Sequence, residues 1–95
     1  MDNKTHIPIE ECCAYYSIET SFVRSLSEHG LIELMEINET YSIDYEHLPL
    51  LEKYMRLHYD LDVNMEGIEV ISHLLQKVEN LQHELKALKY AGTDI

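Results

Sequence analysis

The chain has 95 residues and a net charge of −11, from eighteen acidic and seven basic side chains, with an ordinary hydrophobic content of 45%. This length suits one small domain, whose core is marginal unless oligomerisation buries further area. The charge argues against nucleic-acid binding, which draws most of its affinity from Lys and Arg placed at phosphates. It favours a basic partner instead.

The sequence carries no targeting or membrane segment that we can recognise. No apolar run approaches the length of a membrane span, and Met1–Pro8 does not resemble a signal peptide. We therefore expect a cytoplasmic protein with no membrane partner. Cys12 and Cys13 are adjacent, so they would point in different directions in one helix, and we interpret them as buried reduced thiols.

Two short helices are predicted at the start of the chain. The first spans Ile7–Tyr16, with Pro8 tolerated in its first turn. Ser17 is expected to cap a second helix from Ile18 to His29, which Gly30 ends in the left-handed conformation. Two short helices joined by a tight turn indicate a helix-turn-helix. The expected core faces, spaced by three or four residues, are Ile9, Cys12, Cys13 and Tyr16 in the first helix and Ile18, Phe22 and Leu26 in the second.

A small β-hairpin is predicted next, within Leu31–Ile43. Apolar residues surround Asn38-Glu39-Thr40, which suits a turn between two short strands, although the strong Asn-Gly signal is missing. Asp44 is expected to cap a helical turn, and Pro49 to begin a third helix. The expected apolar side of that helix is Leu50, Leu51, Tyr54, Leu57, His58 and Leu61.

The longest predicted helix runs from Asn64 to Tyr90. Asn64 suits its N-cap, and Lys86 and Lys89 precede Gly92 at its end. One face repeats apolar residues every three or four positions and forms a heptad seam. We call this set the apolar seam: Ile71, Leu74, Val78, Leu81, Leu85 and Leu88.

Two interpretations of this helix remain open. In the first, its first half packs on the domain and its second half pairs with another copy, so that the chain is a homodimer. In the second, the whole helix lies across its own small core, served by Ile68, Val70 and Leu75.

The order helix, helix, hairpin, helix, long helix resembles the layout of MerR-type winged-helix proteins, and most closely the CbpM chaperone modulators among them. The resemblance spans about Ile9 to Leu88. The residues that carry it are Ile9-Glu10-Glu11-Cys12-Cys13, Ile18, Gly30-Leu31-Ile32-Glu33, Ile43-Asp44, Arg56-Leu57, Leu61-Asp62-Val63 and Gly67-Ile68.

The resemblance implies a protein that binds and inhibits the J-domain of a DnaJ-like co-chaperone, whose second helix is typically basic. It also implies an antiparallel dimer, whereas β-branched a positions with leucine at d suit a parallel pair in model systems. DNA-binding MerR regulators carry several Lys and Arg in their second helix. Here the only Lys or Arg within Ser17–Gly30 is Arg24, which puts sequence-specific DNA binding in doubt.

Metal binding and catalysis have little support in the sequence. His58 and Asp62, Glu69 and His73, and Glu79 and His83 lie four apart, but none converges on a third ligand. No glycine-rich turn offers an oxyanion hole to a cysteine or histidine. We expect no enzyme activity, no metal and no cofactor.

The chain is rich in tyrosine. Six tyrosines suit either a protein interface or the rim of a small core: Tyr15, Tyr16, Tyr41, Tyr45, Tyr54 and Tyr59.

The expected fold is mostly α: a MerR-like winged helix-turn-helix with a small β-hairpin wing and a long C-terminal dimerisation helix. Residues 1–63 would form the winged domain and residues 64–95 the coiled-coil helix, with the apolar seam at the dimer interface. The expected function is inhibition of a J-domain co-chaperone, and the alternative is a MerR-type DNA-binding transcription regulator. The expected partner-binding residues are the acids on and just after the hairpin: Glu33, Glu36, Glu39, Asp44 and Glu46. No Lys or Arg lies between Arg24 and Lys53 to neutralise them, so they suit a basic partner. The alternative is that the wing is charged only to stay soluble.

Overall fold

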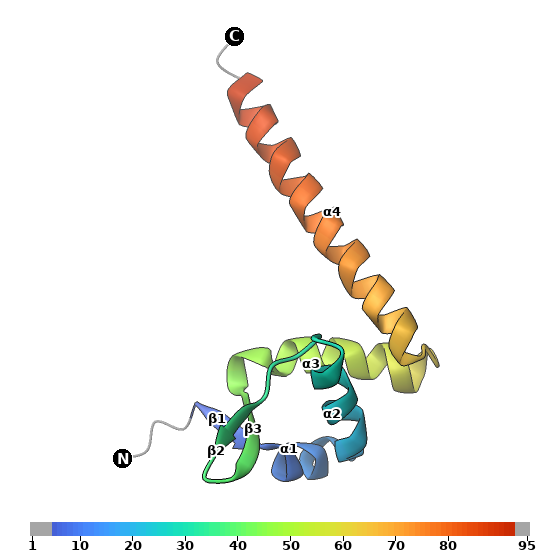
Figure 1. Cartoon of the computed structure of the whole chain (residues 1–95). Helices are drawn as coiled ribbons and strands as arrows, with labels where there is room; N and C mark the ends of the chain where they lie inside the picture. The colour runs from blue at the N-terminus through green and yellow to red at the C-terminus, as the bar shows by residue number, and fades with distance from the viewer. Residues whose placement is uncertain (1–4, 93–95) are drawn as a thin grey trace.

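A computed structural model describes residues 5–92, as a small winged domain from which one long helix projects (Figure 1). Its principal extents are 57 × 39 × 20 Å. The elements, in chain order, are β1 (His6–Pro8), α1 (Ile9–Tyr16), α2 (Thr20–Glu28), β2 (Met35–Ile37), β3 (Thr40–Asp44), η1 (Tyr45–His47), α3 (Leu48–Met55), η2 (Arg56–Asp60) and α4 (Met65–Gly92). This confirms the mostly helical winged helix-turn-helix.

The chain enters the domain as a strand, so the prediction of a helix from Ile7 was wrong. β1 pairs antiparallel with β3, with Ile7 opposite Ile43, and α1 begins only at Ile9. The physical reason lies in Pro8, because the ring of a proline pushes the residue before it out of the helical region and into extended backbone. Pro8 itself is extended, with φ −58° and ψ 143°.

The turn between α1 and α2 also differs from the prediction, because Ser17 ends the first helix instead of capping the second. Ser17 takes a left-handed φ of 59°. Its N–H donates to the Ala14 carbonyl, and the Ile18 N–H donates to the Cys13 carbonyl at 3.0 Å. This is a Schellman ending, which satisfies the last carbonyls of α1. Glu19 precedes α2 without a side-chain cap.

The end of α2 follows the prediction. Gly30 has φ 71°, and the N–H of Leu31 donates to the Leu26 carbonyl at 2.9 Å. Only glycine adopts this conformation at little cost, so the chain can reverse there. The buried stripe of α2 consists of Phe22, Val23 and Leu26.

The predicted hairpin is confirmed and forms the wing, β2 and β3. Asn38 and Glu39 at its tip both have positive φ, 51° and 63°. Two successive positive φ values are typical of the type I′ turn, whose twist matches that of the two strands. With β1 the wing makes a three-stranded antiparallel sheet of order β1-β3-β2.

The third helical segment begins with the predicted cap, since Asp44 Oδ1 accepts the Glu46 N–H at 2.8 Å. α3 starts at Leu48, with the proline in its first turn as expected. It continues into a π-helical turn, η2, that ends at Asp60. Leu61 was predicted on the apolar side of the helix, and this was wrong: it is exposed because the chain has already left the helix there.

One core holds the domain together, and it is filled by residues from α1, α2, β3, α3, the start of α4 and the segment between α2 and β2. Tyr54 is buried in it, and its hydroxyl donates to the Leu31 carbonyl at 3.3 Å. The buried apolar residues are Ile9, Cys12, Cys13, Phe22, Val23, Leu26, Leu31, Ile32, Ile43, Leu51, Tyr54 and Ile68.

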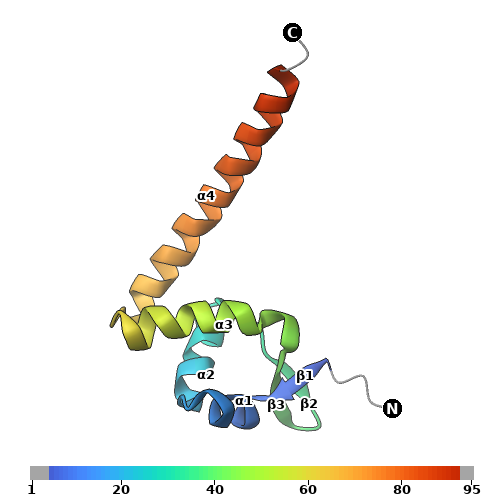
Figure 2. The same ribbon diagram turned by 180° about the vertical axis from the view of Figure 1, so that it is seen from behind.

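α4 starts at its predicted cap, because Asn64 Oδ1 accepts the Gly67 N–H at 2.8 Å. The helix then leaves the domain, as both views of the ribbon show (Figure 1 and Figure 2). Ile68 reaches the core, whereas Val70 and Leu75 are exposed. The alternative interpretation, that the whole helix lies across its own core, was therefore wrong, whereas the predicted packing of the first half on the domain holds for its initial turns. The anchored part extends to Ile71 and Ser72, which are half-buried, and Ser72 Oγ lies 3.5 Å from the Tyr54 hydroxyl.

Candidate interaction surfaces

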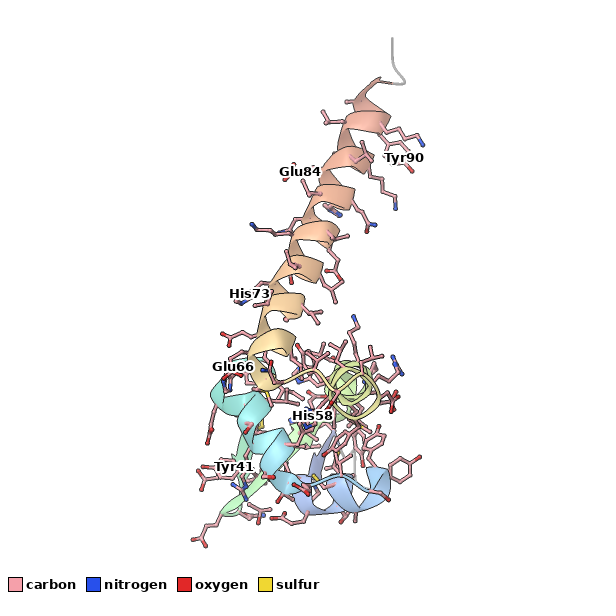
Figure 3. All side chains as sticks on the ribbon, turned by 90° about the vertical axis from the view of Figure 1, so that its right-hand side faces the viewer. Tyr41, His58, Glu66, His73, Glu84 and Tyr90 are labelled. Atoms are coloured by element: carbon pink, nitrogen blue, oxygen red, sulfur yellow. The ribbon has the colours of Figure 1, made fainter. Side chains whose placement is uncertain are left out.

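The apolar seam lies on the projecting part of α4. Ile71 is half-buried, and the other five members, from Leu74 to Leu88, are 46% to 71% exposed. Figure 3 shows α4 carrying its side chains away from the domain, with His73, Glu84 and Tyr90 labelled along it. Within residues 5–92 these leucines and this valine are therefore largely open to solvent. A row of this length in water is typical of an interaction surface.

The five acids expected to bind a partner are distributed over both faces of the wing. In the antiparallel register Glu36 lies opposite Tyr41, and Asp44 lies opposite His6. Directly opposed residues share a face, and successive residues alternate faces. Glu36 and Asp44 therefore point to opposite sides of the sheet. Glu33 precedes β2, Glu39 lies in the turn and Glu46 lies in η1.

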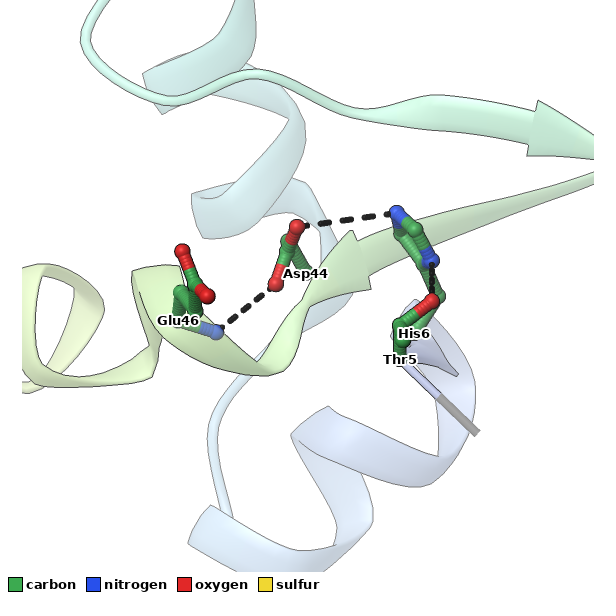
Figure 4. Close-up of polar contacts among 4 residues, drawn as sticks. All are labelled: Thr5, His6, Asp44 and Glu46. Carbon is green, nitrogen blue, oxygen red and sulfur yellow. Dashed lines mark hydrogen bonds and ion pairs between the residues drawn. The ribbon is translucent and has the colours of Figure 1, made fainter. Parts of the chain in front are cut away.

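Asp44 also has a structural role at the end of β3, which Figure 4 shows. One carboxylate oxygen caps η1 through the Glu46 N–H, and the other lies 3.9 Å from His6 Nε2. The second ring nitrogen of His6 is hydrogen-bonded to the Thr5 hydroxyl at 2.7 Å. Asp44 thus links β1, β3 and η1.

In a MerR-type regulator the second helix, here α2, would contact the bases of DNA. The single basic side chain of α2, Arg24, already contacts another side chain of the domain. The Arg24 guanidinium lies over the Tyr41 ring, 5.7 Å from its centroid. This cation–π contact joins α2 to the wing. The exposed face of α2 otherwise presents Ser21 and the acidic Glu28.

The histidine pairs do not converge on a metal site: the part of the chain that the structure describes contains no group of three potential ligands. His58 is part of the packing instead. Its ring stacks on Phe22, with 4.7 Å between centroids, and its Nδ1 donates to the Val63 carbonyl at 3.0 Å. It fixes the turn between η2 and α4.

The two cysteines are free and buried. Burial raises the pKa of Cys12 to about 11, and the neighbouring Cys13 adds to the effect. Burial also raises the pKa of Cys13. Because the thiolate is the nucleophilic form, both side chains are chemically inert near neutral pH. They belong to the core, as expected.

The tyrosines divide between the two interpretations. Tyr54 is a core residue, and Tyr16 lies at the edge of the core, where its hydroxyl donates to Glu52 Oε2 at 2.7 Å. Burial, and secondarily this hydrogen bond, raise the pKa of Tyr16. Tyr15, Tyr41, Tyr45 and Tyr59 are 42% to 80% exposed, although the ring of Tyr41 already contacts Arg24 and that of Tyr59 packs against Phe22 and His58.

A hollow on the outer face of the sheet was not predicted from the sequence. It has a volume of about 340 Å³ and is lined by residues of all three strands together with Glu11 and Tyr45. The alternation of Met35 and Ile37 with Glu36 was a visible signal for an apolar outer face. The prediction of a helix from Ile7 leaves no third strand, however, so a three-stranded surface could not be expected there.

Comparison with known proteins gives two matches. The sequence matches the MerR HTH family of regulatory proteins over residues 7–90. It is also 30% identical over 78 residues to the chaperone modulatory protein CbpM of Pseudomonas putida (strain W619), an alignment that covers 81% of this chain and 77% of that protein. No solved structure matches. Neither description is that of an enzyme.

Proposed function

Because this chain belongs to the MerR family of helix-turn-helix regulatory proteins, as a protein of the CbpM type, we propose that it is a non-enzymatic inhibitor of a DnaJ-like co-chaperone. It acts by binding the J-domain through an acidic surface. The name of the Pseudomonas relative supports chaperone modulation as the general role. A J-domain target is what the resemblance to the CbpM modulators implies, and a cytoplasmic location is part of the same proposal.

The observation that carries this proposal is the charge of the winged domain. Residues 25–52 contain no Lys or Arg, and the only base of α2 lies over Tyr41. A surface of this kind repels a phosphate backbone and attracts a basic helix. The wing therefore steers a basic protein partner, where a DNA-binding relative would need cations.

We also propose that the chain acts as a homodimer, with residues 64–95 as the dimerisation helix and residues 1–63 as the winged domain. The exposed apolar seam supports this, since large apolar side chains in a row gain free energy when a second copy covers them. In the dimer the two helices lie antiparallel, as in the family that the sequence resembles.

Surface plasmon resonance with an immobilised J-domain tests the steering role of the wing. Glu36→Lys and Asp44→Lys, measured separately because they lie on opposite faces, should each slow association and flatten its dependence on salt. Glu28→Lys at the end of α2 is the control with the same change in charge. If neither wing variant differs from this control, the wing does not steer the partner.

The family match also keeps the MerR-type DNA-binding regulator as a second candidate function. A mobility-shift assay against genomic fragments at low salt decides between the two. We expect no sequence-specific retardation. Robust retardation of particular fragments would favour the transcription regulator.

A further inference from the structure

The outer face of the sheet presents two apolar side chains to solvent. Met35 is 50% exposed and Ile37 is 39% exposed. The register pairs Met35 with Ser42 and Ile37 with Thr40, so these four residues share one face. This face lies on the side of the sheet opposite to Ile43, which is in the core.

The hollow of about 340 Å³ adjoins these apolar side chains. Its lining includes His6, Pro8, Glu11, Ile37, Ser42 and Tyr45, and it contains no Lys or Arg. Ligand pockets in proteins have volumes of about 300–1,000 Å³, so this one suits a single long side chain. Asp44, next to His6, adds a second carboxylate at its edge.

Ser42 contributes a hydroxyl to the lining of the hollow. The residue is only 5% exposed, the one buried polar residue of the described chain, and it lines the hollow. A serine hydroxyl can both donate and accept hydrogen bonds, so it can accept one from a cationic group that enters the hollow.

We propose that the hollow receives a lysine or arginine side chain from a basic amphipathic helix of the partner. The aliphatic stem of that side chain packs against Ile37, Pro8 and Tyr45. Its cationic head donates hydrogen bonds to the Glu11 carboxylate and the Ser42 hydroxyl. The apolar side of the helix contacts Met35.

This inference rests on the proposed function for the identity of the partner, and it names the contact that holds the partner after steering. A second copy of this face is a poor occupant, because the hollow carries Glu11 and adjoins Asp44 with no Lys or Arg in its lining, so two such faces repel each other. An apolar centre within an acidic surround matches the usual anatomy of a protein interface.

Two adjacent acids provide a matched test. Glu11 lines the hollow, whereas Glu10 does not, and both are exposed in the first turn of α1. In surface plasmon resonance with the J-domain, Glu11→Gln should speed dissociation about tenfold, because it leaves a bound cation unpaired. Glu10→Gln, which removes the same charge, should leave dissociation unchanged.

A second pair tests the apolar contact on the two faces of the same hairpin. Ile37→Ser should weaken binding, whereas Tyr41→Ser, at a residue 42% exposed on the opposite face, should not. Circular dichroism checks that all four variants keep the wild-type fold. If the J-domain binds the members of each pair equally, the hollow is not the contact, while the proposed function stands.

If the wild-type chain does not bind the J-domain at all, the proposed function fails and a second probe judges the hollow. The probe is a helical peptide of leucine, alanine and lysine, titrated into the ¹⁵N-labelled chain and followed by NMR. Shifts confined to Glu11, Ile37, Thr40 and Ser42, and lost in Glu11→Gln, support a cation site. Shifts elsewhere, or none, overturn it.

Discussion

Ser17 holds a left-handed backbone conformation that glycine adopts more cheaply than any other residue. At φ 59° the Cβ of serine lies too close to the backbone, a strain of roughly 1–2 kcal/mol. The sequence did not reveal this, because a serine between two helices suits the start of the second as well as the end of the first.

Ser17→Gly should therefore stabilise the domain. We expect the free energy of unfolding in urea to rise by about 0.5–1 kcal/mol, the relief of strain less the greater chain entropy of glycine. Ala14→Gly, inside α1, is the control and should lower it by about 1 kcal/mol. A loss of stability in Ser17→Gly would show that the serine side chain itself supports the turn.

Cys12 should make the free energy of unfolding fall as the pH rises through the alkaline range. Its folded-state pKa of about 11 lies above the ordinary value of 9.0, because burial disfavours the thiolate. The folded chain thus holds this proton more tightly than the unfolded chain does, so the stabilisation is complete below pH 9 and is lost as the pH rises towards 11.

Urea unfolding at pH 8 and at pH 10.5 measures this effect. The wild-type chain should lose more stability between the two values than Cys12→Ala, which has no thiol to ionise. Equal losses in the two proteins would mean that Cys12 ionises as easily in the fold as outside it.

At the scale of elements, the sequence located every helix and the hairpin but missed β1. The periodicity of Ile9, Cys12 and Cys13 was real, yet Ile7 pairs with Ile43 because the residue before a proline prefers extended backbone. The surface formed by three strands was consequently hidden from sequence reasoning. Pairing between distant segments leaves no periodic pattern in either one.

The hairpin turn has a non-optimal residue at its second position. Glu39 has φ 63°, where a type I′ turn favours glycine after asparagine. Glu39→Gly should raise the free energy of unfolding by up to about 1 kcal/mol. Glu39→Gln removes the charge without relieving the backbone and is the control. If glutamine stabilises the chain as much as glycine, charge repulsion in the wing, not φ, limits the turn.

At the scale of the whole molecule, the heptad pattern predicted the long helix, but it did not decide between a second half that leaves the domain and a helix that lies across its own core. Amphipathicity indicates which face needs cover, not what covers it. Ile68 reaches the core, whereas Leu74 and the following seam residues are exposed. None of the helices described over residues 5–92 combines the length and the hydrophobicity of a membrane span.

A charge placed on the apolar seam should separate the proposed dimer. Val78→Asp and Leu81→Asp would each bury an uncompensated carboxylate between two helices, at a cost of several kcal/mol. Sedimentation equilibrium should find the wild type dimeric at tens of micromolar and both variants monomeric. Asn80→Asp adds the same charge beside the seam and should stay dimeric. A monomeric wild type would refute the dimer.

The claim that this acidic winged protein captures a J-domain is tested most directly by sedimentation velocity with a dye-labelled J-domain of a DnaJ-like co-chaperone. Only the dye is monitored, so any change reports the partner itself. With excess chain present, the J-domain should move in a larger species that contains the dimer, and high salt should dissociate that complex. A J-domain that sediments at the same rate with and without the chain, at low salt and tens of micromolar, would contradict the account.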